Sequence, residues 1–340
     1  MTSITVCVPV YDAAAFVRET LDHIAAQTFR DFKVLVSVDE CSDDSELVCR
    51  RMESDSRFEV VTQTRRLGWV GNVNWLIGQV DTPFFCITPH DDLLDPHYLQ
   101  ATRDLLMREP AAACAYSDIQ GFGEQEPVIS QPEVRGDRMQ RVLDALLNHY
   151  SAVTFRGLIR RRNTEDRPLV PTGIPRDFAA DTAWTVRLAL RGELLRIPAL
   201  LYRKRYDDSS VHAGWGALPR REHLQLQAGM VAVCTRTALE ETSDPVEREE
   251  ILTAGLLRAS GYSRSGGWGV PMQPLEIARS VAEYALATRD LGALPDLDVV
   301  LGRTRVAALQ NALAIHASCR DVAPPLRTRV LRKARKLMGL

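Results

Sequence analysis

The chain has 340 residues, 45% of them hydrophobic and 25% charged, which is typical of globular proteins rather than disordered or fibrous ones. Its 42 basic and 44 acidic residues give a net charge of -2, so the overall charge does not indicate nucleic-acid binding. No stretch approaches the ~20 apolar residues of a membrane span, and the short apolar run at 4–10 indicates a strand, not a signal peptide.

The first 120 residues alternate between strand and helix patterns. Apolar, β-branched runs predict five strands, at 4–10, 32–38, 58–63, 83–88 and 113–119. Segments with helical spacing or capping residues separate them; in the first, Val17, Leu21 and Ile24 recur on one helical face. Continuous apolar strands alternating with helices predict an α/β fold, with a mainly parallel sheet covered on both faces.

After residue 120 the alternation weakens. A loop rich in Gly, Pro and charged residues at 121–138 precedes patterns of a strand at 153–161, a helix at 177–192 and a strand at 197–206. From about residue 217 onward the patterns are nearly all helical. We therefore expect a sheet-containing domain at 1–215 and a helical region at 216–340 with an acceptor, oligomer or membrane-surface role.

Seven cysteines are scattered along the chain without a Cys-x-x-Cys pair. Cys7, Cys86 and Cys114 lie in apolar runs, where a free thiol behaves as a small hydrophobic side chain. This pattern argues against a disulfide framework or a zinc site, and it favours a cytoplasmic location.

Polar residues follow the predicted strands at their carboxyl ends, where parallel sheets bind ligands. Tyr11 and Asp12 follow the first strand, Asp39 the second, and Asp91 and Asp92 the fourth. Adjacent carboxylates repel each other unless a cation lies near, and Mg²⁺ and Mn²⁺ prefer oxygen ligands. The alternative is that these acidic residues belong to loops and helix caps.

Other candidate residues lie further along the chain. Asp181, at the start of a predicted helix, is either a cap or a general base. Several arginines are candidates for phosphate contact or are simply solvated: Arg156, Arg160, Arg161, Arg162, Arg203 and Arg205. The sequence has no Walker-type phosphate loop and no G-x-G-x-x-G after the first strand.

Five segments in this order resemble the family 2 glycosyltransferases, which have a GT-A fold. They are "VCVPVYD", "QTFRDFKVLVSVDECSDDS", "RRLGWVGNVNWLI", "TPHDDLLDPHYL" and "FAADTAWTVRLALRGELLRIPALLYRKRYDDSS". The resemblance implies an enzyme that transfers a sugar, with inversion, from a nucleoside-diphosphate sugar to an acceptor hydroxyl or amine. The acceptor class stays open between a glycan, a lipid-linked molecule and a small molecule.

The resemblance also implies roles for individual residues. Asp181 would be the general base, and Asp91 would bind Mn²⁺ or Mg²⁺ on the diphosphate. The implied donor-binding residues are Pro9, Val10, Tyr11, Asp12, Asp39, Asn74, His90, Asp91, Arg203 and Arg205. Tyr11 would pack against the base and Asp39 would bind it. Asp39 could accept a hydrogen bond from an imide N–H, which uracil and thymine have and cytosine lacks, and this favours a UDP- or dTDP-sugar as the donor.

The chain departs from the family pattern at two places in these segments. Pro89 stands where members often have a further acidic residue, two positions before Asp91. Arg205 replaces a His that often follows the Tyr-Arg pair, so either this cation neutralises the diphosphate or His212 supplies the imidazole as a metal ligand.

The end of the chain is a basic amphipathic segment, at 325–338. It is expected either to lie on an anionic membrane surface, placing the protein peripherally at the inner membrane, or to dock on its own domain or on a second copy in a homo-oligomer. Two other functions stay open. One is a non-catalytic scaffold with a degenerate nucleotide site; the other is a sugar-nucleotide nucleotidyltransferase, whose Gly-rich loop after the first strand this chain lacks.

Overall fold

A computed structural model describes residues 2–148, 153–207, 214–215 and 218–259. The chain divides into two compact units. The first unit comprises residues 1–138, 151–172 and 187–217, and the second comprises residues 139–150, 173–186 and those from 218 onward. The division into 1–215 and 216–340 remains a prediction about where the functions lie.

The first unit contains all nine strands of the described residues, in one sheet. Their bounds are β1 Ile4–Val10, β2 Phe32–Val38, β3 Phe58–Thr62, β4 Phe84–Ile87, β5 Leu93–Leu94, β6 Ala112–Gly123, β7 Val128–Ile129, β8 Leu158–Arg160 and β9 Glu193–Tyr206. The order is β3-β2-β1-β4-β8-β6-β9-β5, with β7 paired to β6. The first four strands pair in parallel, as do β6 and β9, while β8 is antiparallel to both its neighbours.

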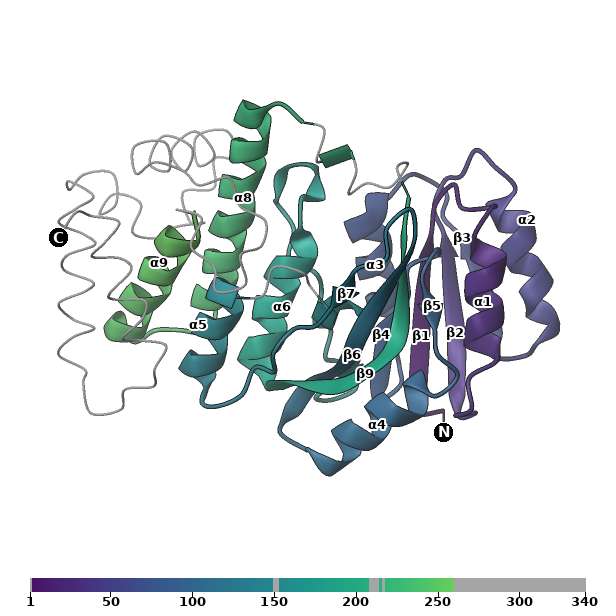
Figure 1. Ribbon diagram of the computed structural model, residues 1–340, viewed down its shortest axis with the longest axis horizontal. Helices are drawn as coiled ribbons and strands as arrows, with labels where there is room; N and C mark the ends of the chain where they lie inside the picture. The colour runs from purple at the N-terminus through teal and green to yellow at the C-terminus, as the bar shows by residue number, and fades with distance from the viewer. Residues whose placement is uncertain (1, 149–152, 208–213, 216–217, 260–340) are drawn as a thin grey trace. The chain divides into compact units, whose positions relative to one another are not determined.

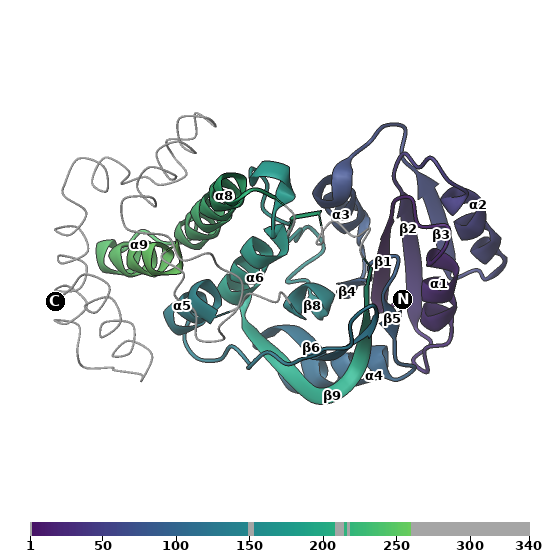
Figure 2. The same cartoon turned by 45° about the horizontal axis from the view of Figure 1, so that its top comes forward.

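Helices cover both faces of the parallel part of this sheet. The helices that belong to the first unit in full are α1 Val17–Ala25, α2 Ser45–Arg50, α3 Gly68–Gln79 and α4 Tyr98–Arg108. Figures 1 and 2 both show α1 and α2 on one side of β1, β2 and β3, and α3 on the other. The predicted fold class, a mainly parallel α/β sheet with helices on both faces, is confirmed.

Burial explains why these segments adopt their structures. Ile4, Val6 and Val8 of β1 are fully buried, because strands covered on both faces need apolar side chains on both. Val17, Leu21 and Ile24 are buried along one face of α1, as their spacing predicts. These contacts form the core beneath the carboxyl edge of the strands.

Two segments differ from their predicted structure. The strand expected at 153–161 begins instead with the 3₁₀ helix η2, Val153–Arg156, and only Leu158–Arg160 form β8. The helix expected after β2 is α2 followed by the 3₁₀ helix η1, Arg51–Ser54. In η2 the residues Val153, Thr154 and Phe155 suit a strand or a helix, and their packing decides between the two.

The second unit is helical. Its elements are α5 Arg138–Asn148 from residue 139, the 3₁₀ helix η3 Pro175–Asp177, the first part of α6 Ala180–Arg191, α8 Arg220–Leu239 and α9 Pro245–Ala259. Buried Arg258 donates to the carbonyls of Ala145 and Leu146, which lie in the last turn of α5 and lack helical partners. No helix among the described residues combines the length and apolarity needed to cross a membrane.

Candidate functional site

The carboxyl edge of the parallel strands gathers most of the predicted donor residues. In the register of the sheet Val10 pairs with Val38, and Cys7 pairs with Ile87, so the ends of three strands meet. Pro9 and Val10 close β1, and Tyr11, Asp12 and Asp39 follow directly. The chain turns that leave β1, β2 and β4 therefore share one rim.

His90 is held at this rim through its ring. Nδ1 lies 3.2 Å from the carbonyl oxygen of Pro9, which can only accept, so Nδ1 carries the proton and donates. The backbone carbonyl of His90 in turn accepts from the hydroxyl of Thr20 on α1. These two contacts fix the turn that presents Asp91 and Asp92.

Asp92 is a buried structural carboxylate. Its Oδ2 accepts from Nε of Arg156 at 2.8 Å and from the hydroxyl of Tyr202 at 2.9 Å. Its Oδ1 accepts from the backbone N–H of Arg205 at 3.1 Å. Because it is 1% exposed and has three donors, Asp92 joins β9 and η2 to the turn after β4.

Asp91 has a different environment, although it is the next residue. Among the described residues its carboxylate forms no hydrogen bond or ion pair with another residue. Burial and then the charge of Asp92 raise the pKa of the Asp91 carboxyl above its ordinary value. A carboxylate that is costly to ionise and forms no ion pair among the described residues is suited to a divalent metal, so the residues present fit the ion that the resemblance implies.

Two predicted donor-binding arginines, Arg203 and Arg205, lie on β9, and they are held differently. Nε of Arg205 donates to the backbone carbonyl of Asp91 at 3.3 Å, and its NH2 group pairs with Glu19 at 2.6 Å. The guanidinium carbon also lies 4.7 Å and 4.4 Å from the ring centroids of Phe16 and Phe122. Arg205 is therefore already engaged at the mouth of the site.

Arg203 is the more available cation. It is exposed, and its guanidinium carbon lies 4.6 Å from the centroid of the Phe122 ring. Within the part of the chain that the structure describes, no carboxylate pairs with it. In the register of β5 and β9 it lies opposite Leu93, two residues beyond Asp91.

Asp39 lies buried at the end of β2 and holds the turn before α3. Its carboxylate accepts from the backbone N–H groups of Leu67 at 2.8 Å and Gly68 at 2.9 Å. Gly68 has φ +72°, a conformation that glycine adopts at little cost. The side chain that the resemblance assigns to the base thus also fixes the start of α3.

Tyr11 is 39% exposed at the rim, and Arg66 lies on its ring. The guanidinium carbon of Arg66 lies 2.9 Å from the ring centroid, and its Nε lies 3.4 Å from Oδ2 of Asp39. Arg66 therefore lies between the two groups assigned to the base. The sequence analysis missed this residue, although its place in the segment "RRLGWVGNVNWLI" was a usable signal.

A second acidic cluster lies on the same rim. Ligand atoms of Asp12, Cys41 and Asp43 lie within 4.8 Å of one another. The backbone N–H of Ser42 donates to Asp12 at 2.7 Å and lowers the pKa of that carboxyl. Hydrogen bonds between the loops after β1 and β2 link these groups, since Asp12 N–H donates to Cys41 and Ala14 N–H donates to Asp43, and Asp91 is not among them.

Asn74 is engaged by a neighbouring loop. Its Oδ1 accepts from the backbone N–H of Val170 at 2.7 Å, and its Nδ2 donates to the carbonyl of the same residue at 3.0 Å. This paired contact positions the loop that follows β8. The structure gives Asn74 a positioning role through this contact, and its direct contact with the donor stays a prediction.

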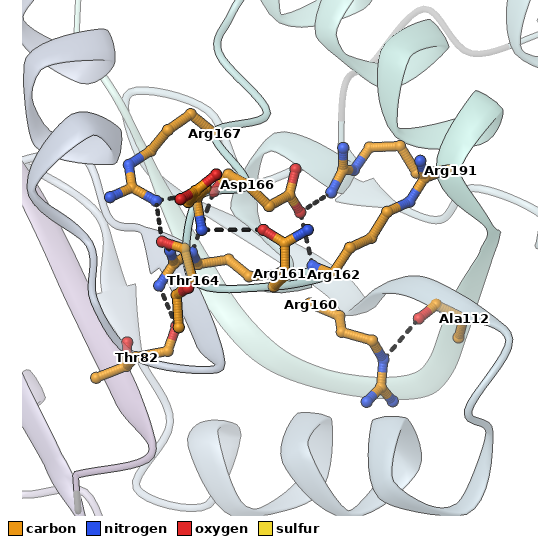
Figure 3. Close-up of polar contacts among 11 residues, drawn as sticks. Thr82, Ala112, Arg160, Arg161, Arg162, Thr164, Asp166, Arg167 and Arg191 are labelled. Carbon is orange, nitrogen blue, oxygen red and sulfur yellow. Dashed lines mark hydrogen bonds and ion pairs between the residues drawn. The ribbon is translucent and has the colours of Figure 1, made fainter.

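Two of the six candidate phosphate arginines, Arg160 and Arg161, have side-chain partners away from the rim. Figure 3 shows that Nε of Arg160 donates to the carbonyl of Ala112 and that Arg161 donates to the carbonyls of Thr82 and Thr164. Asp166 accepts from the backbone N–H of Arg162 at 2.6 Å and pairs with Arg191. Arg160 and Arg161 thus satisfy backbone carbonyls, and Arg156 neutralises Asp92.

Asp181, the predicted base, lies in the second unit at the start of α6. Its carboxylate accepts from the backbone N–H of Thr182 at 3.0 Å, and its carbonyl accepts from Thr185. The residues just before it are strained, since Arg176, Asp177 and Ala179 all have positive φ. Burial raises the pKa of the Asp177 carboxyl. The sequence analysis did not single out Asp177.

Two predicted elements lie outside the described residues. They are His212, the alternative metal ligand, and the basic segment 325–338. Their roles stay predictions.

Comparison with known families decides the class of this domain. The family described as "Glycosyl transferase family 2" matches residues 5–166. Residues 5–166 form a family 2 glycosyltransferase domain. The rim of Tyr11, Asp39 and Asp91 falls within the matched region.

Solved structures show the fold of the glycosyltransferase domain in other proteins. S. aureus TarS matches with a TM-score of 0.61 and 15% identity, over 98% of this chain and 55% of TarS. The chain thus spans about half the length of that protein. TarS 1–349 in complex with UDP-GlcNAc also has a TM-score of 0.61, with 16% identity, over 94% of this chain and 91% of that one. No curated protein sequence matches the chain.

Proposed function

We propose that the protein transfers a sugar, with inversion, from a UDP- or dTDP-sugar to an acceptor hydroxyl or amine. The observation that carries this proposal is the carboxylate of Asp91, which has no partner among the described residues and lies on the same rim as Asp39 and Tyr11. A site for a cation on the diphosphate thereby shares one edge with a site for the base. The TarS structure in complex with UDP-GlcNAc supports a uridine donor on the same fold.

The proposed chemistry requires a proton acceptor and a stabilised leaving group. The acceptor oxygen forms a bond to the anomeric carbon while the bond from that carbon to the diphosphate breaks. Asp181 takes the proton of the acceptor hydroxyl, and the nucleoside diphosphate leaves with the electron pair. Proton transfer to a positioned base contributes ~10²–10⁴-fold to rates of this kind.

The leaving group gathers negative charge, and this chain offers two groups to stabilise it. Asp91 would hold Mn²⁺ or Mg²⁺, which when bound supplies positive charge to the diphosphate oxygens. Arg203 is exposed and has no carboxylate partner among the described residues, so it is the arginine of β9 that we assign to the diphosphate. Arg205 orders the mouth of the site through Glu19 and the carbonyl of Asp91.

A binding and turnover assay tests this function. The full chain is screened by thermal shift against UDP-, dTDP-, GDP- and CDP-sugars with Mn²⁺, and release of the nucleoside diphosphate is then measured for any sugar that binds. A rise in melting temperature with a UDP- or dTDP-sugar, followed by release of the diphosphate, is expected. Binding without release in the presence of candidate acceptors would favour the non-catalytic scaffold, and no binding would reject the donor site.

A further inference from the structure

Arg66 occupies the space between the two groups that the proposed function assigns to the nucleotide base. Its guanidinium lies on the ring of Tyr11, and its Nε lies 3.4 Å from Oδ2 of Asp39. The Arg66 side chain is 43% exposed, whereas that of Asp39 is 2% exposed. The long, rotatable side chain of Arg66 thus lies between the buried carboxylate of Asp39 and the solvent.

Donors within the protein occupy nearly all of the hydrogen-bond acceptor positions of the Asp39 carboxylate. A carboxylate offers about four lone-pair positions for hydrogen bonds. On Oδ1, the backbone N–H groups of Glu40 and Leu67 donate at 3.1 Å and 2.8 Å. On Oδ2, the N–H of Gly68 donates at 2.9 Å. The fourth position faces Arg66, through the longest of the four contacts.

These four donors differ in whether a ligand can displace them. The three backbone amides belong to the turns after β2 and before α3, and they cannot leave without local unfolding. The guanidinium of Arg66 needs only a change of side-chain rotamer. Asp39 therefore has one acceptor position, on Oδ2, that a single N–H of a ligand can take.

We propose that Asp39 and Arg66 together select the base of the donor. One ring N–H of the base replaces Arg66 at Oδ2 of Asp39, and the displaced guanidinium donates to the carbonyl beside that N–H. This inference rests on the proposed function, because it specifies the base of the same nucleotide sugar. It makes Arg66 a specificity-determining residue.

The pairing has a chemical consequence for each base. Uracil and thymine present one N–H flanked by carbonyls, which matches one acceptor beside one donor. Cytosine has a ring acceptor in place of this N–H, so the contact with Asp39 is lost, and it has an amine in place of the C4 carbonyl, so a contact of Arg66 at that side is lost as well. Guanine presents a ring N–H next to an amine, and its second donor would find no free acceptor on Asp39. A site that binds its ligand by hydrogen bonds rejects a base that leaves buried polar groups unpaired.

Calorimetric titration of the full chain with UDP, CDP and GDP, each with Mn²⁺, tests the inference. Arg66→Ala is compared with Arg65→Ala, a matched control because Arg65 is the exposed neighbour in the same loop. The unchanged protein is expected to bind UDP about tenfold or more tightly than CDP or GDP. Arg66→Ala should weaken UDP binding by about tenfold and CDP binding by less than about threefold, since only UDP loses a charge-assisted hydrogen bond.

The outcomes separate this inference from the proposed function. If the unchanged protein binds UDP and Arg66→Ala keeps the same ratio of UDP to CDP affinity, base selection by Arg66 is rejected while the donor site stands. Tighter UDP binding by Arg66→Ala also rejects it, because the guanidinium would then only fill an empty base site. If the unchanged protein binds none of the three nucleotides, the proposed function fails together with the inference.

Discussion

Nε of Arg156 lies 2.8 Å from Oδ2 of Asp92, and this ion pair separates the roles of two adjacent carboxylates. The Asp92 side chain is 1% exposed and that of Arg156 is 14% exposed, so the pair is screened little by water. Once Asp92 is neutralised within the protein, Asp91 is the carboxylate left for a ligand.

Substitution of Asp92 is predicted to act on folding. Asp92→Ala removes the partner of a largely buried arginine and the acceptor of Tyr202, so the free energy of unfolding should fall by about 3–5 kcal/mol. Urea titration followed by circular dichroism measures this change. Asp91→Ala is the matched control and should cost far less. Equal losses for the two variants would mean that Asp91 also has a structural partner.

Substitution of Asp91 is predicted to act on metal-assisted binding. Mn²⁺ should strengthen UDP binding to the unchanged protein, and Asp91→Ala should abolish that increment because the ion loses its protein carboxylate. Calorimetry with and without Mn²⁺, with EDTA as the metal-free reference, measures it. A UDP affinity that is the same with and without the metal would contradict coordination by Asp91.

Asp181→Asn is predicted to separate binding from turnover. The amide keeps the size of the side chain and can still accept from Thr182, but it cannot take a proton. Donor affinity should stay within about twofold, whereas release of the nucleoside diphosphate in the presence of an acceptor should fall by ~10²–10⁴-fold. Turnover retained at the original rate would place the base at another residue.

Asp177 is predicted to give a pH-dependent stability. Burial raises the pKa of its carboxyl, so the folded protein binds more protons than the unfolded chain, and stability falls as pH rises through that range. Asp177→Asn removes the charge and suits the same left-handed backbone. The variant should melt at a higher temperature at pH 7, and the difference should vanish below about pH 4, where both forms are neutral. A difference independent of pH would show that charge is not its cause.

Deletion of residues 325–340 tests the membrane prediction. If the basic segment lies on an anionic surface, the full chain should sediment with phosphatidylserine vesicles and the deletion variant should stay in solution. Raising the salt concentration should release the full chain, since the attraction is electrostatic. A full chain that does not sediment with such vesicles favours docking on its own domain or on a second copy.

Much of the first unit could be predicted because its patterns are local. Buried side chains on both faces of a parallel strand require a continuous apolar run, and "ITVCVPV" and "FKVLVSV" have one. The same logic places Asp39 and Asp91 at the carboxyl edge, because each directly follows such a run or its short turn. The 3₁₀ helix at 153–156 was missed because its residues suit a strand equally well, and only packing distinguishes them.

By itself, the sequence determined the parallel sheet, its acidic edge and the order of the glycosyltransferase motifs, since each depends on residues within one strand, turn or helix. Only the tertiary structure decided which of two adjacent aspartates is left for a ligand. The partners of Asp92 lie 64 and 110 residues away, at Arg156 and Tyr202. It likewise decided that Arg160 and Arg161 cap carbonyls and that Arg66 lies against Asp39. The identity of a charged side chain determines what it can bind, but its neighbours in space determine whether its charge and hydrogen-bonding positions remain available for a ligand.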